Sequence, residues 1–437
     1  MASETLTAAE VSRVLGRVAF GATASDLDTW TGKKYTDLVD ALLDVHPLVP
    51  LPDDAQRLMF ETNQNVNEHD ARAWWLERMR TTPFPLLERM TLLWHGHFAT
   101  GIRYPPTLKH LVVQNQTLRM NALGNVRTLV EAMNVDPAML YWLNGAENSI
   151  PKVNENYARE FFELFTLGKR PQVYTETDIR QAAKAFSGWY VDGNDTAVFA
   201  ESRHNTKKKK ILGRTVGNLG AEEHKELVDI ALDQPVSSLF LAYKLVANLA
   251  YVPDTNDALV KAVATTLRSS EWDIAAAVRT LLLHDAFRVP VPSKEQQLVR
   301  TPVDCVVHAA KALGVRIADP NLVRTIGRMG HELFDPVDVS GFALGRDWVS
   351  PVTALARYEA ARTLHTLALA ETTALVNPLP PAEDLKGWAR RLGLTGFSMN
   401  TMNAVNSYLR TAKNASAHDR QAGTVILLLS SPEWVVF

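Results

Sequence analysis

Apolar residues recur along most of this chain at the three- and four-residue spacing of an amphipathic helix. Near the start, Val11, Val14 and Val18 follow this spacing, and Glu10, three residues after Thr7, completes the sequence pattern of a capping box. The same periodicity predicts helices over twelve further segments. These are residues 71–80, 85–98, 107–123, 126–133, 177–187, 221–232, 237–250, 257–268, 274–283, 302–313, 351–369 and 415–429. Because strand-like alternation is scarce, we predict a mostly α, multi-helical, bundle-like fold with long irregular loops and little or no sheet.

Two segments interrupt the helical pattern. Residues 189–220 are long and polar and include a run of lysines at 207–210. Loops of this length within compact domains are often functional. We interpret the lysines themselves as an exposed cluster on a solvated hairpin. Residues 330–348 are too broken for a helix, and we predict that they pack over other helices as a structured strap.

Similar helix endings at residues 281–287 and 427–434 indicate two helical subdomains. We place the boundary so that the N-terminal subdomain spans residues 1–287 and the C-terminal subdomain spans residues 288–437. The first would carry the polar loop and the densest clusters of polar residues. We expect the two to form one compact unit.

Carboxylate, guanidinium, amide and aromatic groups are densest in residues 153–168. On a helix that begins near Asn154, steps of 100° per residue place Glu160 and Glu163 in one sector beside Arg159, with aromatic residues on the opposite side. Such a helix offers an apolar face to a core and a row of ligand-type groups elsewhere. The alternative is a solvated face on which Arg159 pairs with Glu155 and Glu163 at i, i+4.

A second candidate is the histidine pair His95 and His97. Inside a helix, residues two apart diverge by about 200° and cannot share an ion. Gly96 and residues 99–101 indicate that the helix frays or ends here, and both imidazoles could bind one metal ion only if the chain kinks at the glycine. The alternative is that these histidines cap the helix and form hydrogen bonds in the core.

Taken together, the nitrogen and oxygen donors predict one metal site. Helical bundles build such sites from carboxylates and histidines on facing helices. The expected ligands are His95, His97, Glu160, Glu163 and His204.

Three neighbouring residues are candidates for catalysis. Arg159 carries a planar fork that suits an anionic substrate or a ligand glutamate. Tyr157 and Asp178 are candidates for proton transfer. Asp178 can equally cap the helix that follows it.

Composition narrows the function classes. The 437 residues include 46 basic and 48 acidic residues, a formal net charge of −2, which argues against nucleic-acid binding. A single cysteine, Cys305, cannot form an intramolecular disulfide. The N-terminal residues do not have the pattern of a signal peptide, and we find no apolar stretch of membrane-spanning length. We therefore expect a cytoplasmic chain that acts on a small-molecule substrate, with no nucleic-acid or membrane partner and an oligomeric state that the sequence does not fix.

Several motifs resemble those of the bacterial domain-of-unknown-function 1800 family over nearly the whole chain. The motifs are residues 17–21 (RVAFG), 94–98 (WHGHF), 136–140 (DPAML), 154–160 (NENYARE), 163–168 (ELFTLG) and 431–434 (SPEW). This resemblance implies that the histidine pair, the glutamate-bearing helix, Asp178 and His204 belong to a shared pattern, which favours ligands over a solvated face. Asn205 stands where the family usually has an aspartate, and Val153 where it often has a proline. The first difference removes one anionic ligand.

These observations lead to a metal-dependent enzyme as the predicted function. Mixed nitrogen and carboxylate ligation suits iron, copper or manganese in redox or oxygen chemistry on a small molecule. Zinc-assisted hydrolysis, with a glutamate as general base, uses the same ligand types and is the alternative. A third possibility is a non-catalytic helical binding or scaffold protein, in which every buried carboxylate would need a partner.

Overall fold

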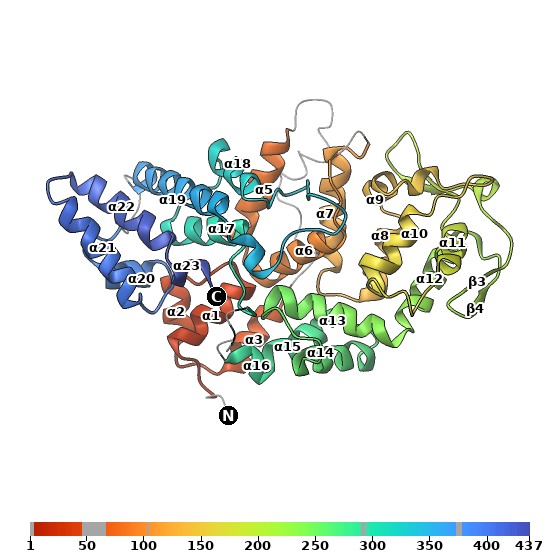
Figure 1. Ribbon diagram of the computed structural model, residues 1–437, viewed down its shortest axis with the longest axis horizontal. Coiled ribbons are helices and arrows are strands. Elements are labelled where there is room, and N and C mark those ends of the chain that lie inside the picture. The colour runs from red at the N-terminus through yellow and green to blue at the C-terminus, as the bar shows by residue number, and fades with distance from the viewer. Residues whose placement is uncertain (1–3, 46–66, 103–104, 290–292, 294, 373–377) are drawn as a thin grey trace.

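Helices account for most of the molecule, as the sequence predicts. The structure is a computed structural model that describes all residues except 1–3, 46–66, 103–104, 290–292, 294 and 373–377. Within these described ranges it contains 22 α-helices and two small antiparallel sheets of two strands each. Figure 1 shows an elongated molecule with α19 to α22 at one end and the strands at the other. The mostly α fold class is therefore confirmed.

Four of the five predicted metal ligands lie on helices before residue 170, and His204 lies later in the chain. The helices before residue 170 are α1 (Ala8–Val18), α2 (Ala24–Trp30), α3 (Tyr35–Leu43), α5 (Glu68–Thr81), α6 (Pro85–His97), α7 (Leu108–Asn121), α8 (Val126–Asn134), α9 (Pro137–Trp142), the 3-10 turn η1 (Gly145–Glu147), α10 (Asn156–Glu160) and the π-helix η2 (Phe161–Thr166).

After residue 170 come one helix, two hairpins and then a second series of helices. They are α11 (Glu176–Ala185), β1 (Trp189–Val191), β2 (Ala197–Phe199), η3 (Glu201–Arg203), β3 (Lys209–Ile211), β4 (Arg214–Val216), η4 (Gly220–Glu222), α12 (Glu223–Leu232), α13 (Pro235–Leu249), α14 (Ala258–Ser269), α15 (Ile274–Leu283), α16 (Asp285–Arg288), α17 (Pro302–Leu313), α18 (Pro320–Arg328), η5 (Gly345–Trp348), α19 (Pro351–Thr372), α20 (Leu385–Arg391), α21 (Met399–Thr411), α22 (Ala417–Leu429) and α23 (Pro432–Val435). None of the described helices is both long and apolar enough to cross a membrane.

The helix starts follow the capping chemistry of the sequence. The backbone N–H of Glu10 donates to Thr7 Oγ1 over 3.2 Å, and the Glu10 carboxylate accepts from the Thr7 backbone N–H over 2.9 Å. The same reciprocal pair opens α17, where Asp304 bonds the backbone N–H and the hydroxyl of Thr301. Each box satisfies donors that the first turn of a helix leaves free.

Two hydrophobic cores meet at α6. The first gathers side chains of α1, α3, α8, η2 and α12 to α15, and α6 adds Leu86 and Met90 to it. The second gathers α5, α17, α18, α19 and α22, and α6 adds Leu92. Since α5 precedes the subdomain boundary predicted at residue 288 and packs against α17 and α18 beyond it, the cores interleave along the chain. The boundary itself stays a prediction.

A buried cluster of charge fixes α6 against its neighbours in the chain. Glu88 accepts from Arg119 Nε over 2.7 Å and from Arg78 Nε over 2.5 Å, and Trp75 Nε1 donates to it over 3.0 Å. Burial alone would raise the pKa of this carboxyl, but the two arginines outweigh burial and hold the pKa below its ordinary value. Glu88 is therefore ionised inside the core and needs both arginines.

The segment between α18 and η5 forms the predicted strap over α6. The backbone N–H of Phe334 donates to His95 Nε2 over 3.1 Å. Farther along, Gly341 has a φ of 93°, and a Cβ at this position would lie 2.1 Å from the backbone oxygen of Gly96. Only glycine allows this approach, so the strap lies directly on the last turn of α6.

Replacing Glu88 by glutamine should destabilise the fold strongly. The change keeps the size of the side chain but leaves the buried guanidinium group of Arg119 and the partly buried one of Arg78 without their anion, which costs roughly 3–5 kcal/mol. Urea denaturation followed by circular dichroism measures the loss in free energy of unfolding. Glu359→Gln, which removes the partly exposed pair with Arg328, is the matched control and should cost less than about 1 kcal/mol. Equal denaturation midpoints for the two variants would contradict this role of Glu88.

Candidate functional site

The glutamate-bearing segment is helical, as predicted, but changes type halfway. The α-helix α10 runs directly into the π-helix η2, where Thr166 Oγ1 donates to the backbone oxygen of Phe161, five residues earlier, over 2.6 Å. The predicted apolar face is confirmed, because Tyr157, Phe161 and Phe165 are buried. π-helical turns are rare in proteins, and those that occur are often found at functional sites. This segment is therefore a candidate for a functional role.

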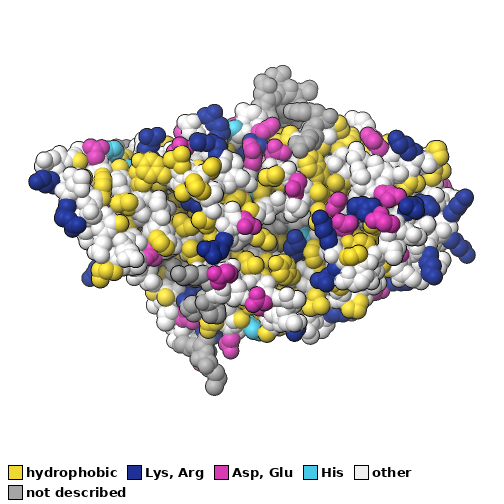
Figure 2. Space-filling view, in the orientation of Figure 1, with side chains coloured by type: hydrophobic (Ala, Val, Ile, Leu, Met, Phe, Trp, Pro, Cys, Tyr) yellow, Lys and Arg dark blue, Asp and Glu magenta, His cyan; other side chains and the backbone are white. Residues whose placement is uncertain are grey.

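Arg159 organises the acidic side chains of this segment near the surface. It donates to both carboxylate oxygens of Glu176, over 2.8 and 2.7 Å. Glu155 and Glu163 lie 3.7 Å from its guanidinium, so the ion-pair ladder considered from the sequence is present. Figure 2 shows acidic and basic side chains together on the part of the visible face where Figure 1 places α10 and α11. The bidentate partner, Glu176, lies outside the predicted set.

The remaining predicted residues of this region have defined places. Glu160 is half-buried, and burial together with the neighbouring Glu163 raises its pKa. The phenol of Tyr157 donates to Asn134 Oδ1 over 2.5 Å inside the core. Asp178 completes a capping box with Thr175 and accepts from the backbone N–H of Leu212 over 2.8 Å. Its structural contacts match the capping role, and its role in proton transfer stays a prediction.

The two histidines of α6 are separated by the helix itself. The helix does end in this region, as expected, but Gly96 lies within it, because α6 continues through His97. His95 Nε2 accepts from the backbone of Phe334, whereas His97 Nε2 lies 3.1 Å from the backbone oxygen of Phe165 in η2. Burial lowers the pKa of His95 to about 4 and that of His97 to about 3. Both rings are therefore neutral at pH 7 and belong to different contacts.

His204 lies in a third location, beneath the hairpins. Its Nδ1 is 2.7 Å from the backbone oxygen of Ser187, and its Nε2 is 3.0 Å from Glu223 Oε1. The other oxygen of Glu223 accepts from Lys209 Nζ over 2.6 Å, and all three side chains are buried. Lysines 207, 208 and 210 are exposed as predicted, but Lys209 is not. This network closes the polar loop onto α12.

The five predicted ligands thus occupy three places in the fold. Within the described ranges, no group of three or more histidine, cysteine, aspartate or glutamate side chains is placed to hold a metal ion. His97 and η2 do come together, through the backbone oxygen of Phe165. Glu160 and Glu163, in contrast, belong to the network around Arg159.

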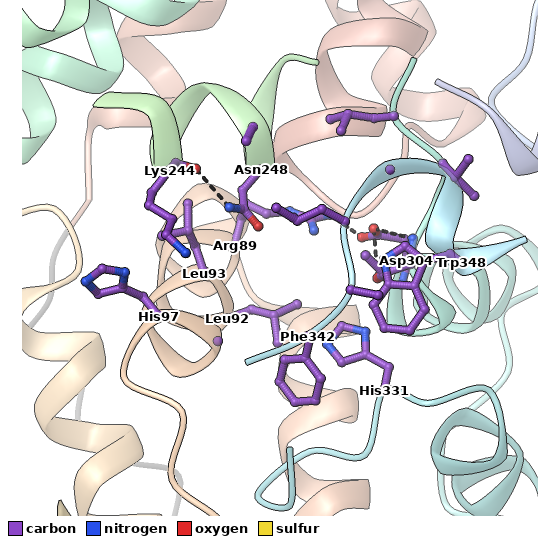
Figure 3. Close-up of a pocket in the computed structure, with 18 of the residues that line it drawn as sticks. Arg89, Leu92, Leu93, His97, Lys244, Asn248, Asp304, His331, Phe342 and Trp348 are labelled. Atoms are coloured by element: carbon purple, nitrogen blue, oxygen red, sulfur yellow. Dashed lines mark hydrogen bonds and ion pairs between the residues drawn. The ribbon is translucent and has the colours of Figure 1, made fainter. Parts of the chain in front are cut away.

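A cavity opens instead between α6 and α13, under the strap. One face of α6 supplies Arg89, Leu93 and His97, and one face of α13 supplies Lys244 and Asn248. The segment before α17 and the strap complete the wall, and the hollow between them measures about 810 Å³ when the solvent at its open mouth is included. Figure 3 shows the Lys244 side chain directed toward His97 at one end. The other lining residues include Leu92, Asp304, His331, Phe342 and Trp348.

Three residues that line this cavity each have a buried polar atom without a hydrogen-bond partner. Arg89 is bound to Asp304, yet its Nε has no hydrogen-bond partner, and the Nδ1 atoms of His97 and His331 also have none. Burial lowers the pKa of His331 to about 3, so this ring is neutral as well. A buried polar atom without a partner costs about 1–3 kcal/mol. Three such atoms on residues around one cavity make it a candidate binding site.

Comparison with known proteins supports the resemblance that the motifs suggest. The family model described as "Protein of unknown function (DUF1800)" matches residues 13–436. The chain belongs to the DUF1800 family. No curated protein and no solved structure matches it. The family assignment of this DUF1800 chain carries no activity, so function has to be argued from the site.

Sequence reasoning missed the α13 side of the cavity in this DUF1800 protein. Lys244 is the only charged residue of the 15-residue helix α13, and Asn248 follows it by four positions. A lone lysine on an otherwise uncharged helix is a signal that the sequence does contain. His331 and Trp348 lie in or beside the predicted strap, but nothing in their spacing shows that they meet α6.

Replacing Lys209 by methionine should destabilise this DUF1800 protein. Glu223 would stay buried without its cation, which costs roughly 3–5 kcal/mol. The matched control is Lys208→Met, one residue earlier and exposed, which should change the free energy of unfolding by less than about 0.5 kcal/mol. Urea denaturation measures both. If the two variants unfold at the same urea concentration, the His204–Glu223–Lys209 network does not stabilise the fold as described.

Proposed function

We propose that the cavity between α6 and α13 binds a small organic anion, with Lys244 as its counter-ion. One observation carries this proposal. Lys244 extends into the cavity, and among the described residues no carboxylate pairs with its ammonium group. Burial lowers the pKa of Lys244 because water no longer solvates its charge fully. An anion in the cavity would replace that lost solvation.

The charge balance of the walls supports an anionic ligand. Of the described side chains that line the cavity, Arg89, Lys244 and Asp304 carry formal charge. Asp304 is occupied, because it binds Arg89 and both donors of Thr301. The pair is neutral as a unit, and the histidines are neutral because burial lowers their pKa values. Among these side chains, Lys244 therefore carries a positive charge that no carboxylate side chain balances.

The apolar walls and the free polar atoms support an organic ligand over a simple inorganic ion. Leu92, Leu93, Phe342 and Trp348 offer hydrocarbon and aromatic surface to the body of a ligand. The Nδ1 atom of His97 carries a lone pair and has no hydrogen-bond partner, since the ring proton on Nε2 is donated to the backbone oxygen of Phe165. A carboxylate with a short apolar body fits this combination of groups.

Phenylacetate, with phenylacetamide as a neutral match, tests the proposal. Isothermal titration should detect phenylacetate and weaker binding of the amide. Lys244→Met should weaken phenylacetate binding about tenfold to a hundredfold, because a hydrogen bond to a charged group contributes roughly 1.5–3 kcal/mol. Lys244→Arg, which keeps the charge, should retain most of the affinity. Equal binding of acid and amide, or unchanged binding to Lys244→Met, would overturn the proposal.

Metal dependence, with redox or hydrolytic chemistry, stays a prediction from the sequence. The unprotonated Nδ1 of His97 is a nitrogen of the kind that binds iron, copper and zinc, and it favours this second function. If all five predicted ligands bound one ion, His204 would have to break its contact with Glu223. Glu163 would likewise have to move away from Arg159. That rearrangement would weaken two existing contacts.

Elemental analysis checks the metal prediction directly. Protein expressed with supplemented iron, copper, manganese and zinc should contain one of them in stoichiometric amount if the prediction holds. Glu163→Gln should then lower the metal content, whereas Glu155→Gln, which alters the same surface network, should not. Metal-free wild-type protein, or equal metal in both variants, would contradict a site that includes Glu163.

A further inference from the structure

Lys244 shares its face of α13 with a second polar residue, Asn248. The two are four residues apart and both line the cavity. Side chains at this spacing are neighbours on the surface of a helix, with Cβ atoms about 5–6 Å apart. Both residues are half-buried, whereas residues 245–247 between them are buried. A ligand whose anionic group meets Lys244 therefore has the amide of Asn248 beside it.

The amide of Asn248 is oriented by a bond to its own helix. Its Nδ2 donates to the backbone oxygen of Lys244 over 2.8 Å, and this oxygen can only accept. The bond fixes the amide nitrogen against the helix backbone and leaves Oδ1 on the other side of the planar group. Figure 3 shows the nitrogen of Asn248 at Lys244 and its oxygen turned away from that bond into the cavity. Within the described part of the chain, no donor is bonded to Oδ1.

The hydroxyl groups of the wall are already engaged, in contrast to this amide oxygen. Thr301 Oγ1 donates to the carboxylate of Asp304 and accepts from its backbone N–H. The hydroxyl group of Ser340 donates to Asp338. The ammonium group of Lys244 has donors and no acceptor. The α13 side of the cavity thus offers a cation and, one helical turn away, a free acceptor.

We propose that the cavity selects 2-hydroxy carboxylates, with the carboxylate at Lys244 and the 2-hydroxyl group donating to Asn248 Oδ1. This inference rests on the anion site proposed above and names its ligand class. A 2-hydroxy acid carries its two polar groups on adjacent carbon atoms, which suits two side chains one helical turn apart. Its apolar substituent then lies against Leu93 and Phe342, which line the same cavity. Three separate contacts distinguish the two mirror images of such a ligand.

Mandelate tests this inference, because it is phenylacetate with a hydroxyl group on the carbon next to the carboxylate. In isothermal titration, one enantiomer should bind about twofold to tenfold more tightly than phenylacetate, the range of a hydrogen bond between uncharged groups. The other enantiomer should show no such gain. Asn248→Leu keeps a side chain of similar size without the amide, so it should bind all three compounds with about equal affinity. Asn248→Ala should give the same result and covers the case that leucine does not fit the wall.

The outcomes separate this inference from the anion site on which it rests. Ser340→Ala, which removes a hydroxyl group already bonded to Asp338, is the matched control and should keep the preference for one enantiomer. Phenylacetate binding without tighter binding of either enantiomer would overturn the hydroxyl contact and leave the anion site standing. Persistence of the preference in both Asn248 variants would also overturn the contact. If the wild-type protein binds none of the three compounds, both proposals are wrong.

Discussion

The structure depends on burying ionised groups along α6. This helix is buried on nearly all sides although it carries Glu88, Arg89, His95 and His97. An unpaired buried charge, such as that of Glu88 or Arg89, costs several kcal/mol, and a buried neutral imidazole without a hydrogen bond costs about 1–3 kcal/mol. Each of the four residues therefore needs its partner in place when the helix is covered.

Those partners come from parts of the chain that are far apart. Glu88 binds α5 and α7, Arg89 binds Asp304 at the start of α17, and the two histidines contact the strap and η2. A single helix thereby couples both hydrophobic cores, because neither core can close over α6 without supplying its share of the partners. The cavity lies along the same helix. It occupies the face of α6 between α13 on one side and the segment before α17 and the strap on the other.

The local sequence pattern predicted where most of the long helices lie, but not which helices pack against one another. Residues 274–283 and 302–313 match α15 and α17 at both ends, because a capping aspartate or threonine precedes a periodic apolar run. In contrast, α21 was missed, since asparagine and threonine are frequent in it and lower its helix propensity. Short helices such as α2 and α20 were missed because they span barely two turns.

The candidate site shows the same division between local and distant information. Periodicity placed Arg159 correctly between Glu155 and Glu163, because i, i+4 neighbours follow from the helix alone. It did not reveal the bidentate partner Glu176, which follows a turn. The burial of Lys209 beside Glu223 was equally hidden, since three exposed lysines surround it in the sequence. Distant contacts decide such cases, and spacing does not encode them.

Comparison of the buried and partly buried cations shows why Lys244 is the one that points to function. Arg17 donates to the backbone oxygen of Phe287, Lys311 donates to the backbone of Ala19, and Arg300 binds His308. These cations lie in closed packing, and each has a polar partner that accounts for its presence. Lys244 has no such partner among the described residues, and it faces an open cavity. Arg17, Lys311 and Arg300 stabilise the fold through these contacts. An ammonium group without such a contact at a cavity wall is instead explained by a ligand that the cavity binds.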